Sequence, residues 1–182
     1  MNQSQELFGS PSEKAANKVR PYMVEWVQSF IKNSPFMVMA TSNHNGDCDA
    51  SPKGGVAGFV KVLSEKRLLI PDVAGNKLFQ SYENFETNPK VGLIFFIPGI
   101  NSSARVNGTI RILRKSDAEF EKISLEVHSP DEKAKILQAI LVEVQESYSQ
   151  CPRALAFSKL WSTETIMENI ENPPIENWVA GT

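Results

Sequence analysis

Hydrophobic and polar positions along the chain follow patterns that are typical of an antiparallel sheet with a few helices. Apolar residues fill both faces of two short runs, 36–41 and 91–97, as in strands at the centre of a sheet. Residues 105–112 alternate strictly, so one face of that strand meets the core and the other meets water, a ligand or a second subunit. Two more strands are predicted at residues 56–63 and 67–71.

Asn45-Gly46 lies between the first strand and a segment rich in short polar residues. Both residues tolerate a positive φ, so the pair predicts a tight hairpin turn. With the strands at 56–63 and 67–71, the first part of the chain is predicted to form a meander of neighbouring antiparallel strands.

Apolar residues recur at helical spacing elsewhere. One stripe predicts a helix that begins near Ala16 and ends at Ser34-Pro35, and shorter helices are predicted at 76–85 and 116–125. Residues 129–132 have the pattern of a capping box with Pro at the first helical position, which predicts another helix. That helix carries an apolar stripe formed by Ile136, Ile140, Val144 and Tyr148.

The fold class follows from the order of these elements. About six antiparallel strands with interspersed helices and no regular βαβ units predict an α+β domain built on a small barrel. We expect one domain over residues 1–182, with loosely attached tails at 1–16 and 165–182. The sequence contains neither GxGxxG nor GxxxxGK[ST], so a phosphate site would have to come from strand ends and a helix start.

Composition narrows the function classes. The net charge of −2 and the pI near 5.8 provide no basic surface for nucleic acid or an anionic membrane, so neither partner is expected. Two Cys and two His residues without metal-ligand spacing predict no disulfide framework and no metal site. The chain shows no secretory signal and no apolar run that could span a bilayer, which predicts a cytoplasmic protein.

Two short segments carry the candidate chemistry. Ser51 and Lys53 offer a hydroxyl and an ammonium beside Gly54-Gly55, and Asn76-Lys77 opens a predicted helix. A helix start presents unpaired N–H groups and a positive dipole end, which suit a phosphate. Either lysine taken singly is equally typical of a solvated surface, so only the pair together suggests an anion site.

The order of these signals resembles the pyridoxamine 5′-phosphate oxidase-like family of FMN-binding split barrels. The resemblance covers residues 18–161. It rests on Ser34-Pro35-Phe36, Asn45-Gly46-Asp47, Asp49-Ala50-Ser51-Pro52-Lys53-Gly54, Ile70-Pro71-Asp72, Gly75-Asn76-Lys77, Asn88-Pro89-Lys90-Val91-Gly92, Arg105-Val106-Asn107-Gly108 and Ser158-Lys159-Leu160-Trp161.

The resemblance implies a six-stranded antiparallel split barrel with peripheral helices, forming a homodimer with FMN at the subunit interface. It also implies a set of residues that contact the cofactor, with Lys53 and Lys77 on the phosphate. In such proteins the C-terminal stretch comes from the partner subunit. The implied set is Ser51, Pro52, Lys53, Gly54, Ile70, Pro71, Asp72, Asn76, Lys77, Arg105, Asn107, Lys159 and Trp161.

The implied activity is an FMN-dependent oxidoreductase that uses a small-molecule substrate or a nicotinamide electron donor. The chain lacks the Arg-Leu-His-type segment of the name-giving oxidase and has no His after His128, so oxidation of vitamin B6 is not expected. Three alternatives stay open: a deazaflavin-dependent reductase on the same barrel, a flavin-binding or storage protein without turnover, and a haem-binding relative. No residue is identified as a general base, and catalytic residues are left unassigned.

Overall fold

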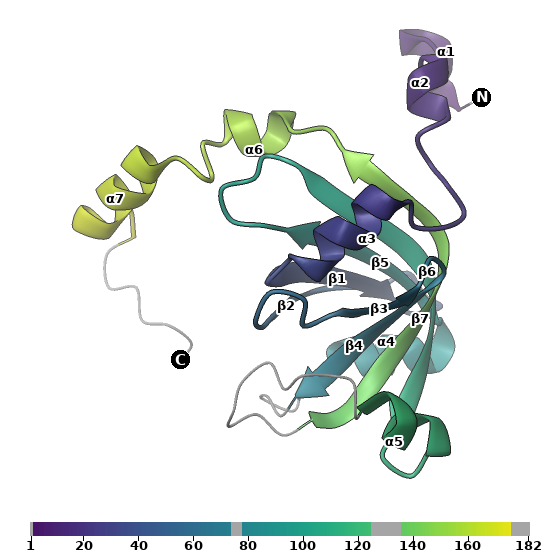
Figure 1. The fold of residues 1–182 in the computed structure, drawn as a ribbon. Helices are drawn as coiled ribbons and strands as arrows, with labels where there is room; N and C mark the ends of the chain where they lie inside the picture. The colour runs from purple at the N-terminus through teal and green to yellow at the C-terminus, as the bar shows by residue number, and fades with distance from the viewer. Residues whose placement is uncertain (1, 74–77, 125–135, 176–182) are drawn as a thin grey trace.

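The protein is described by a computed structural model that places residues 2–73, 78–124 and 136–175 (Figure 1). Seven antiparallel strands form one sheet in the order β2-β1-β5-β6-β7-β4-β3. The strands are β1 Phe36–Ser42, β2 Cys48–Gly54, β3 Lys61–Ser64, β4 Arg67–Val73, β5 Lys90–Phe96, β6 Ser103–Arg114 and β7 Ile136–Gln150. The helices are α1 Gln3–Phe8, α2 Glu13–Ala16, α3 Glu25–Lys32, α4 Gln80–Thr87, α5 Ala118–Ser124, α6 Arg153–Phe157 and α7 Thr163–Glu171.

The sheet curls around one main apolar core (Figure 1). Strands β1, β4, β5, β6 and β7 each contribute to it, helix α3 inserts Val27, Phe30 and Ile31, and helix α4 adds Phe85. A smaller cluster around Phe120 lies between α5 and strands β4, β6 and β7. The predicted α+β class with an antiparallel sheet and peripheral helices is therefore confirmed, with seven strands in place of six.

Most predicted strands are present. The runs at 36–41, 67–71, 91–97 and 105–112 correspond to β1, β4, β5 and β6. The prediction at 56–63 is wrong for its first half, because the strand begins only at Lys61. The residues before Lys61 lie instead next to the end of α3, where the Gly58 N–H donates to the carbonyl oxygen of Ser34.

The helix predicted after residue 132 is wrong where the structure describes it, because residues 136–150 form strand β7. The apolar residues that suggested a helix are four positions apart, and positions four apart also share one face of a strand. The pairing with neighbouring strands decides whether this segment forms a helix or a strand. β7 bonds to β6 along one edge and to β4 along the other, so both of its edges are satisfied.

The first long helix also begins later than predicted. Helix α3 starts at Glu25 rather than near Ala16, and Arg20 forms an antiparallel bridge with Ser147. Pro21 explains the difference, since the residue before a proline is driven toward extended backbone. The Arg20 N–H then donates to the Ser147 carbonyl oxygen at 3.0 Å and ties the chain to β7.

The helix predicted at 76–85 begins instead at Gln80, which makes α4, and Asn76 and Lys77 lie outside the described residues. Residue Phe79 precedes the helix with φ of 53°. A bulky side chain in the left-handed region is unusual and is typical of a backbone held by its surroundings. The helix predicted at 116–125 is confirmed as α5.

The predicted meander breaks between β2 and β3, which lie at opposite edges of the sheet. β2 pairs only with β1, and β4 beyond Leu69 pairs only with β7. Two free strand edges are therefore left, and helix α4 lies close to the first of them. This arrangement creates the space in which the candidate site lies.

Both ends of the described chain carry short helices outside the barrel (Figure 1). Helices α1 and α2 precede the barrel, and α6 and α7 follow it, with α7 standing well away from the sheet. No side chain within α1, α6 or α7 is buried. None of the helices in the described ranges has the length and apolar character that a membrane span requires.

The pairing of β6 with β7 leads to a stability prediction at Gly108, beside the irregularity in their register. A Cβ atom added there would lie 2.3 Å from the Glu143 carbonyl oxygen. Because that oxygen belongs to the backbone, it cannot move aside without a shift of the chain. We expect Gly108→Ala to lower the free energy of unfolding by about 3 kcal/mol, as for other overpacked cores.

Urea unfolding followed by circular dichroism measures the effect. Gly92→Ala on neighbouring β5 is the matched control, because the nearest atom to its added Cβ is the Asn107 Oδ1 at 3.4 Å. Equal losses of stability in the two variants would show that the close approach at Gly108 is not a constraint.

Candidate functional site

A small polar cavity lies between the free edge of β2, the end of β4 and the first turn of α4, and we name it the inner cleft. Its volume is about 160 Å³. Segments far apart in the sequence meet here, including the predicted residues Ser51, Lys53 and Asp72. The lining residues are Asp49, Ser51, Lys53, Asp72, Val73, Leu78, Phe79, Gln80, Ser81 and Tyr82.

Strand register explains why Ser51 and Lys53 face this cleft. Lys53 lies opposite Met37, and Ser51 lies opposite Met39. Opposed residues of antiparallel strands share a face, and both methionines are fully buried in the core. Ser51 and Lys53 therefore point toward the interior side of the sheet, at an edge where no further strand covers them.

Helix α4 is fastened to the same strands by side-chain hydrogen bonds. The Ser81 hydroxyl donates to Asp49 Oδ2 at 2.6 Å, and the Asn84 Nδ2 donates to the Thr41 Oγ1 at 2.9 Å in a buried position. Charge-assisted and buried hydrogen bonds of this kind fix the position of a helix more tightly than apolar contact alone. The first turn of α4 is thereby held against β2, where it forms a wall of the cleft.

The opposite wall holds an acidic group next to a phenol. Asp72 is 9% exposed and accepts a hydrogen bond from Gln138 Nε2 at 3.1 Å. The Tyr82 hydroxyl is buried and makes no well-formed hydrogen bond within the described residues. Burial raises the pKa of Tyr82 well above its usual value, and the nearby Asp72 carboxylate raises it further. Tyr82 is therefore a neutral phenol whose hydroxyl lies beside the Asp72 carboxylate and Gln138.

The charge inside the cleft is mixed. Among the described lining residues, the carboxylates of Asp49 and Asp72 face one ammonium, that of Lys53. Lys53 has no hydrogen bond or ion pair with another described residue, so its charge is available to a ligand. A dianionic phosphate needs further positive charge, and the only other candidate from the sequence, Lys77, lies outside the described residues.

Arg105 and Asn107 lie on the other face of the sheet, so the structure does not bring them to the inner cleft. Arg105 is in register with Ile94, which lies opposite Val38 and, beyond it, Pro52. The outer face therefore carries every second residue of each of these strands. On this face the Arg105 guanidinium stacks over the Tyr148 ring, 5.2 Å from the ring centroid. Pro52 and Gly54, which alternate with Ser51 and Lys53, share the outer face.

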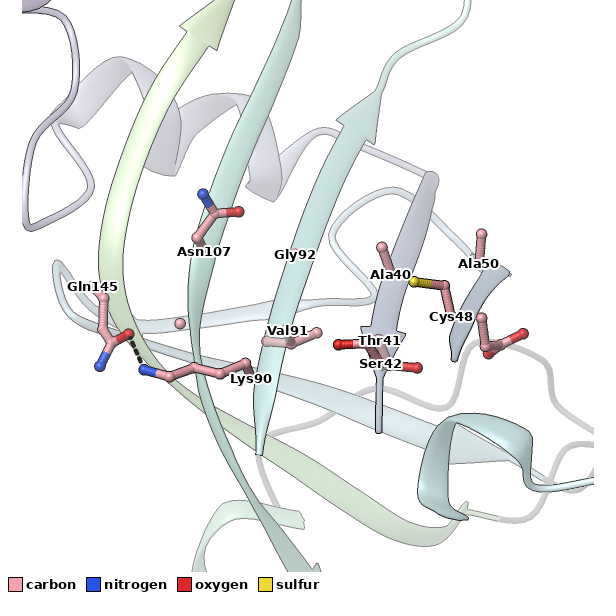
Figure 2. Close-up of a pocket in the computed structure, with 12 residues that line it drawn as sticks. Ala40, Thr41, Ser42, Cys48, Ala50, Lys90, Val91, Gly92, Asn107 and Gln145 are labelled. Atoms are coloured by element: carbon pink, nitrogen blue, oxygen red, sulfur yellow. Dashed lines mark hydrogen bonds between the residues drawn. The ribbon is translucent and has the colours of Figure 1, made fainter. Parts of the chain in front are cut away.

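The outer face carries a shallow trough of about 540 Å³ (Figure 2). Figure 2 shows Ala50, Ala40, Gly92 and Asn107 as successive members of one row across four strands, which agrees with their register. Small side chains give this row a flat floor.

Polar groups border the outer trough. Lys90 Nζ donates to Gln145 Oε1 at 2.8 Å, and Asn107 Nδ2 donates to Glu146 Oε2 at 3.1 Å. The exposed Cys48 lies at the end of the trough on β2. Within the described residues, no helix or strand covers this face above Ala40 and Ala50, both of which are exposed.

The remaining predicted residues are dispersed. The Ile70 side chain is 1% exposed and belongs to the main core, and Pro71 is buried on the opposite face of β4 beside Ala139. Lys159 and Trp161 lie beyond α6, outside the barrel, and the indole N–H of Trp161 is buried without an acceptor among the described residues. Of the predicted residues that the structure describes, the inner cleft therefore gathers only Ser51, Lys53 and Asp72.

Sequence reasoning missed three polar residues that line the cleft, Asp49, Ser81 and Tyr82, and Gln138, which bonds to the lining residue Asp72. Tyr82 contributes to the apolar stripe of its helix, so its spacing gave no sign of a polar role. Ser81 and Gln138 act through partners that are 32 and 66 positions away, which no local pattern reveals. Asp49 begins the motif that predicted the site, and its position two residues before Ser51 on the same strand face was a usable signal.

The residues fit part of a flavin cofactor. The lining offers a free ammonium, hydroxyls and a neutral phenol, which suit a phosphate and a polyhydroxyl chain. A cleft of about 160 Å³ is below the 300 Å³ or more that usually encloses a whole small ligand, so it suits one end of FMN. Within the described ranges, no three His, Cys, Asp or Glu side chains are grouped to hold a metal ion.

Comparison with known proteins identifies related sequences and folds. The family model of pyridoxamine 5′-phosphate oxidase matches residues 23–151 of this chain. No curated protein matches the sequence. The family match includes the inner cleft and the outer trough and ends before α6, so Lys159 and Trp161 lie beyond it.

Three solved structures share the fold. A candidate pyridoxamine 5′-phosphate oxidase from Lactobacillus delbrueckii is 21% identical, with a TM-score of 0.54, and the match covers 71% of this chain and 95% of that one. A variant of HupZ from Group A Streptococcus is 17% identical, with a TM-score of 0.52 and coverages of 70% and 99%. An FMN-binding protein from Syntrophomonas wolfei is 9% identical, with a TM-score of 0.52 and coverages of 69% and 87%. At such identities the likeness shows the fold.

The raised pKa of Tyr82 predicts a pH dependence of stability. The unfolded state releases the phenol proton near pH 10, whereas the folded state holds it to higher pH. The contribution of Tyr82 is therefore fully present below pH 10 and is lost as the pH rises above it, by up to about 1.4 kcal/mol per pH unit. Tyr82→Phe should remove this loss, because the phenylalanine ring has no proton to release.

Urea unfolding of the wild type and Tyr82→Phe at several pH values between 8 and 11 provides the measurement. Tyr148→Phe, which removes a tyrosine from the outer face, controls for the loss of one phenol. Parallel stability curves for the wild type and Tyr82→Phe above pH 10 would contradict the assignment.

Proposed function

The chain belongs to the pyridoxamine 5′-phosphate oxidase family, and from that membership we propose that it is an FMN-binding oxidoreductase. The observation that carries the proposal is the meeting of Ser51, Lys53 and Asp72 in the inner cleft. The sequence resemblance assigned these residues to one cofactor before their positions were known. They come from two strands that lie far apart in the order of the sheet and become neighbours only because the sheet curls.

Lys53 is the described residue best suited to the FMN phosphate, because its ammonium has no protein partner. We assign Lys77 as the second cation, since residues 74–77 follow directly on Val73 of the cleft wall. Ser51 and the Tyr82 hydroxyl are suited to the polyhydroxyl chain. The cleft of about 160 Å³ would hold only the phosphate end of the cofactor, and the carboxylates of Asp49 and Asp72 would disfavour a second anion there.

In this proposal a second subunit covers the part of the cofactor that the inner cleft cannot enclose. The outer face of β1, β2 and β5 exposes Phe36 at 39% and Ala40, a composition that suits contact with a second protein surface. The resemblance implies a homodimer, and Lys159 and Trp161 lie between α6 and α7 and do not line the cleft. These residues are assigned to the cofactor of the partner subunit.

Bound FMN supplies the electron transfer, and the protein residues supply binding and orientation. Lys53 neutralises phosphate charge, and Tyr82 donates a hydrogen bond as a neutral phenol. The electron donor is proposed to be a nicotinamide or a small organic substrate, and the reaction needs no protein group as general base.

Replacement of both assigned phosphate cations tests the placement of the cofactor. Lys53→Ala with Lys77→Ala should weaken FMN binding by more than 100-fold, because each charge-assisted contact contributes roughly 1.5 to 3 kcal/mol. Titration of flavin fluorescence measures the affinity, and circular dichroism checks that the fold is intact. Lys66→Ala, in the exposed turn before β4, is the matched control. Wild-type affinity in the double variant would contradict the phosphate site.

Spectroscopy of the purified protein tests the oxidoreductase activity. We expect flavin absorption bands, bleaching when NADH or NADPH is added without oxygen, and recovery when air returns. A bound flavin that no nicotinamide reduces would favour a storage protein. A protein that binds only deazaflavin, or that shows a haem Soret band, would contradict the assignment of FMN.

A further inference from the structure

A further cavity, which we name the edge groove, lies between helix α4 and the part of β6 that extends past β5. Its volume is about 540 Å³, and sites for small molecules usually have about 300 to 1,000 Å³. β5 begins at Lys90, opposite Thr109, so β6 beyond this point has no strand on its β5 side among the described residues. Phe79 and Tyr82 line both the edge groove and the inner cleft, so the two cavities are neighbours.

Strand geometry leaves one pair of backbone groups unpaired at the groove. The Ile110 N–H donates to the Pro89 carbonyl oxygen at 2.9 Å, on the side of β6 that faces β5. The N–H and C=O of one strand residue point to the same side, and this side alternates along the strand. Those of Ile112 therefore also face the groove, where no described residue pairs with them. Arg114 is the next such residue, but Asp117 occupies both of its backbone groups.

A single donor and acceptor pair suits a small ligand better than a peptide strand. A peptide that extends a sheet gains its affinity from a row of main-chain hydrogen bonds, and Ile112 offers only one such pair. Nucleobases carry a donor beside an acceptor on one planar edge, which matches this pair. The Phe79 side chain is 43% exposed and lines the groove, so its ring is available for a base to stack on.

Side chains of both charges surround the groove. Glu83 and Glu86 lie about one turn apart on α4, and Arg114 lies at the end of β6. None of these three side chains has an ion pair with another described residue, whereas Arg111 is paired with Glu119. The two carboxylates would repel a bare anion, so a fitting ligand has hydrogen-bond donors near α4 and an anionic group near Arg114.

A nucleotide carries each of these groups in one molecule. Carboxylates accept hydrogen bonds from ribose hydroxyls in dinucleotide-binding proteins, which suits Glu83 and Glu86. The forked donors of a guanidinium suit a phosphate, which assigns Arg114. A free amino acid also has charges of both signs, but it lacks the planar donor and acceptor edge that Ile112 would pair with.

We propose that the edge groove binds a nucleoside 5′-monophosphate group. Glu83 and Glu86 hold the ribose hydroxyls, Arg114 holds the phosphate, and the Ile112 backbone pairs with the base. The group belongs either to a free nucleotide or to a nicotinamide dinucleotide, whose other half could reach the neighbouring inner cleft. Only the dinucleotide source rests on the proposed function.

Calorimetric titration of the full chain with adenosine 5′-monophosphate (AMP), in the presence of one equivalent of FMN, tests the site. Arg114→Gln should raise the dissociation constant of AMP by roughly 10 to 100 fold, because a charge-assisted contact to the phosphate is lost. Lys115→Gln is the matched control. It removes the next positive charge along the chain, does not line the groove and should bind AMP like the wild type.

The ribose contact has a separate readout. The wild type should bind AMP roughly 10 fold more tightly than 2′,3′-dideoxyadenosine 5′-monophosphate, because the analogue has no hydroxyls for the carboxylates. Glu83→Ala with Glu86→Ala should remove this preference. Damage to the fold would weaken both ligands alike and leave the ratio of the two dissociation constants unchanged.

Kinetics of the flavin-loaded protein with NADH separates the two sources of the nucleotide. A raised KM with unchanged kcat in Arg114→Gln identifies the dinucleotide, since uniform binding is lost. An unchanged KM beside weakened AMP binding identifies a free nucleotide.

Three outcomes would overturn the site. They are a wild type that does not bind AMP, an Arg114→Gln variant that binds AMP as tightly as the wild type, and AMP that further FMN displaces, which would place AMP in the inner cleft. Weakened AMP binding in Arg114→Gln, in a protein that binds no flavin, would contradict the proposed function alone.

Discussion

The polar attachment of α4 to β1 and β2 is the constraint on which the site depends. A sheet that curls without closing leaves strand edges exposed, and something must fix the distance between them. Here the buried bond from Asn84 to Thr41 and the bond from Ser81 to Asp49 hold the helix at the edge. Buried polar pairs have strict geometric requirements, so they select one position for the helix where apolar contact would permit several. The inner cleft exists because that position is fixed.

Much of the fold could be predicted because local patterns agreed with tertiary structure. The strands at 36–41 and 91–97 are apolar on both faces, and they lie inside the sheet. The wrong prediction at residues 136–150 arose because a helix and a strand can show the same spacing of apolar residues. A four-residue period fits a helix and a strand equally well, and only the neighbouring strands of β7 decide between them. Pro21 is a local signal that was available and that explains the late start of α3.

The candidate site was predictable in part. Alternation along β2 places Ser51 and Lys53 on one face, and strand ends are natural places for Asp72. No local pattern could show that Arg105 and Asn107 face the other side of the sheet, because that depends on how β5 aligns with both β1 and β6. A helix stripe likewise cannot show that the hydroxyl of Tyr82 ends beside Asp72. The two faces therefore differ in character, with charged and hydroxyl groups at the inner cleft and small side chains in the row that crosses the outer trough.

The position of β7 in the sheet also bears on how the protein is made. Among the described strands, β7 comes last in sequence, yet it alone joins β6 to β4. Until residue 150 has left the ribosome, the β2-β1-β5-β6 portion and the β4-β3 hairpin have no shared strand. Sheet assembly must then wait for contacts between residues such as Leu69 and Leu141, which lie far apart in sequence, and such long-range pairing is slow. Until β7 is synthesised, the edges of β6 and β4 that pair with it stay open, and unpaired strand edges make a folding intermediate prone to aggregate.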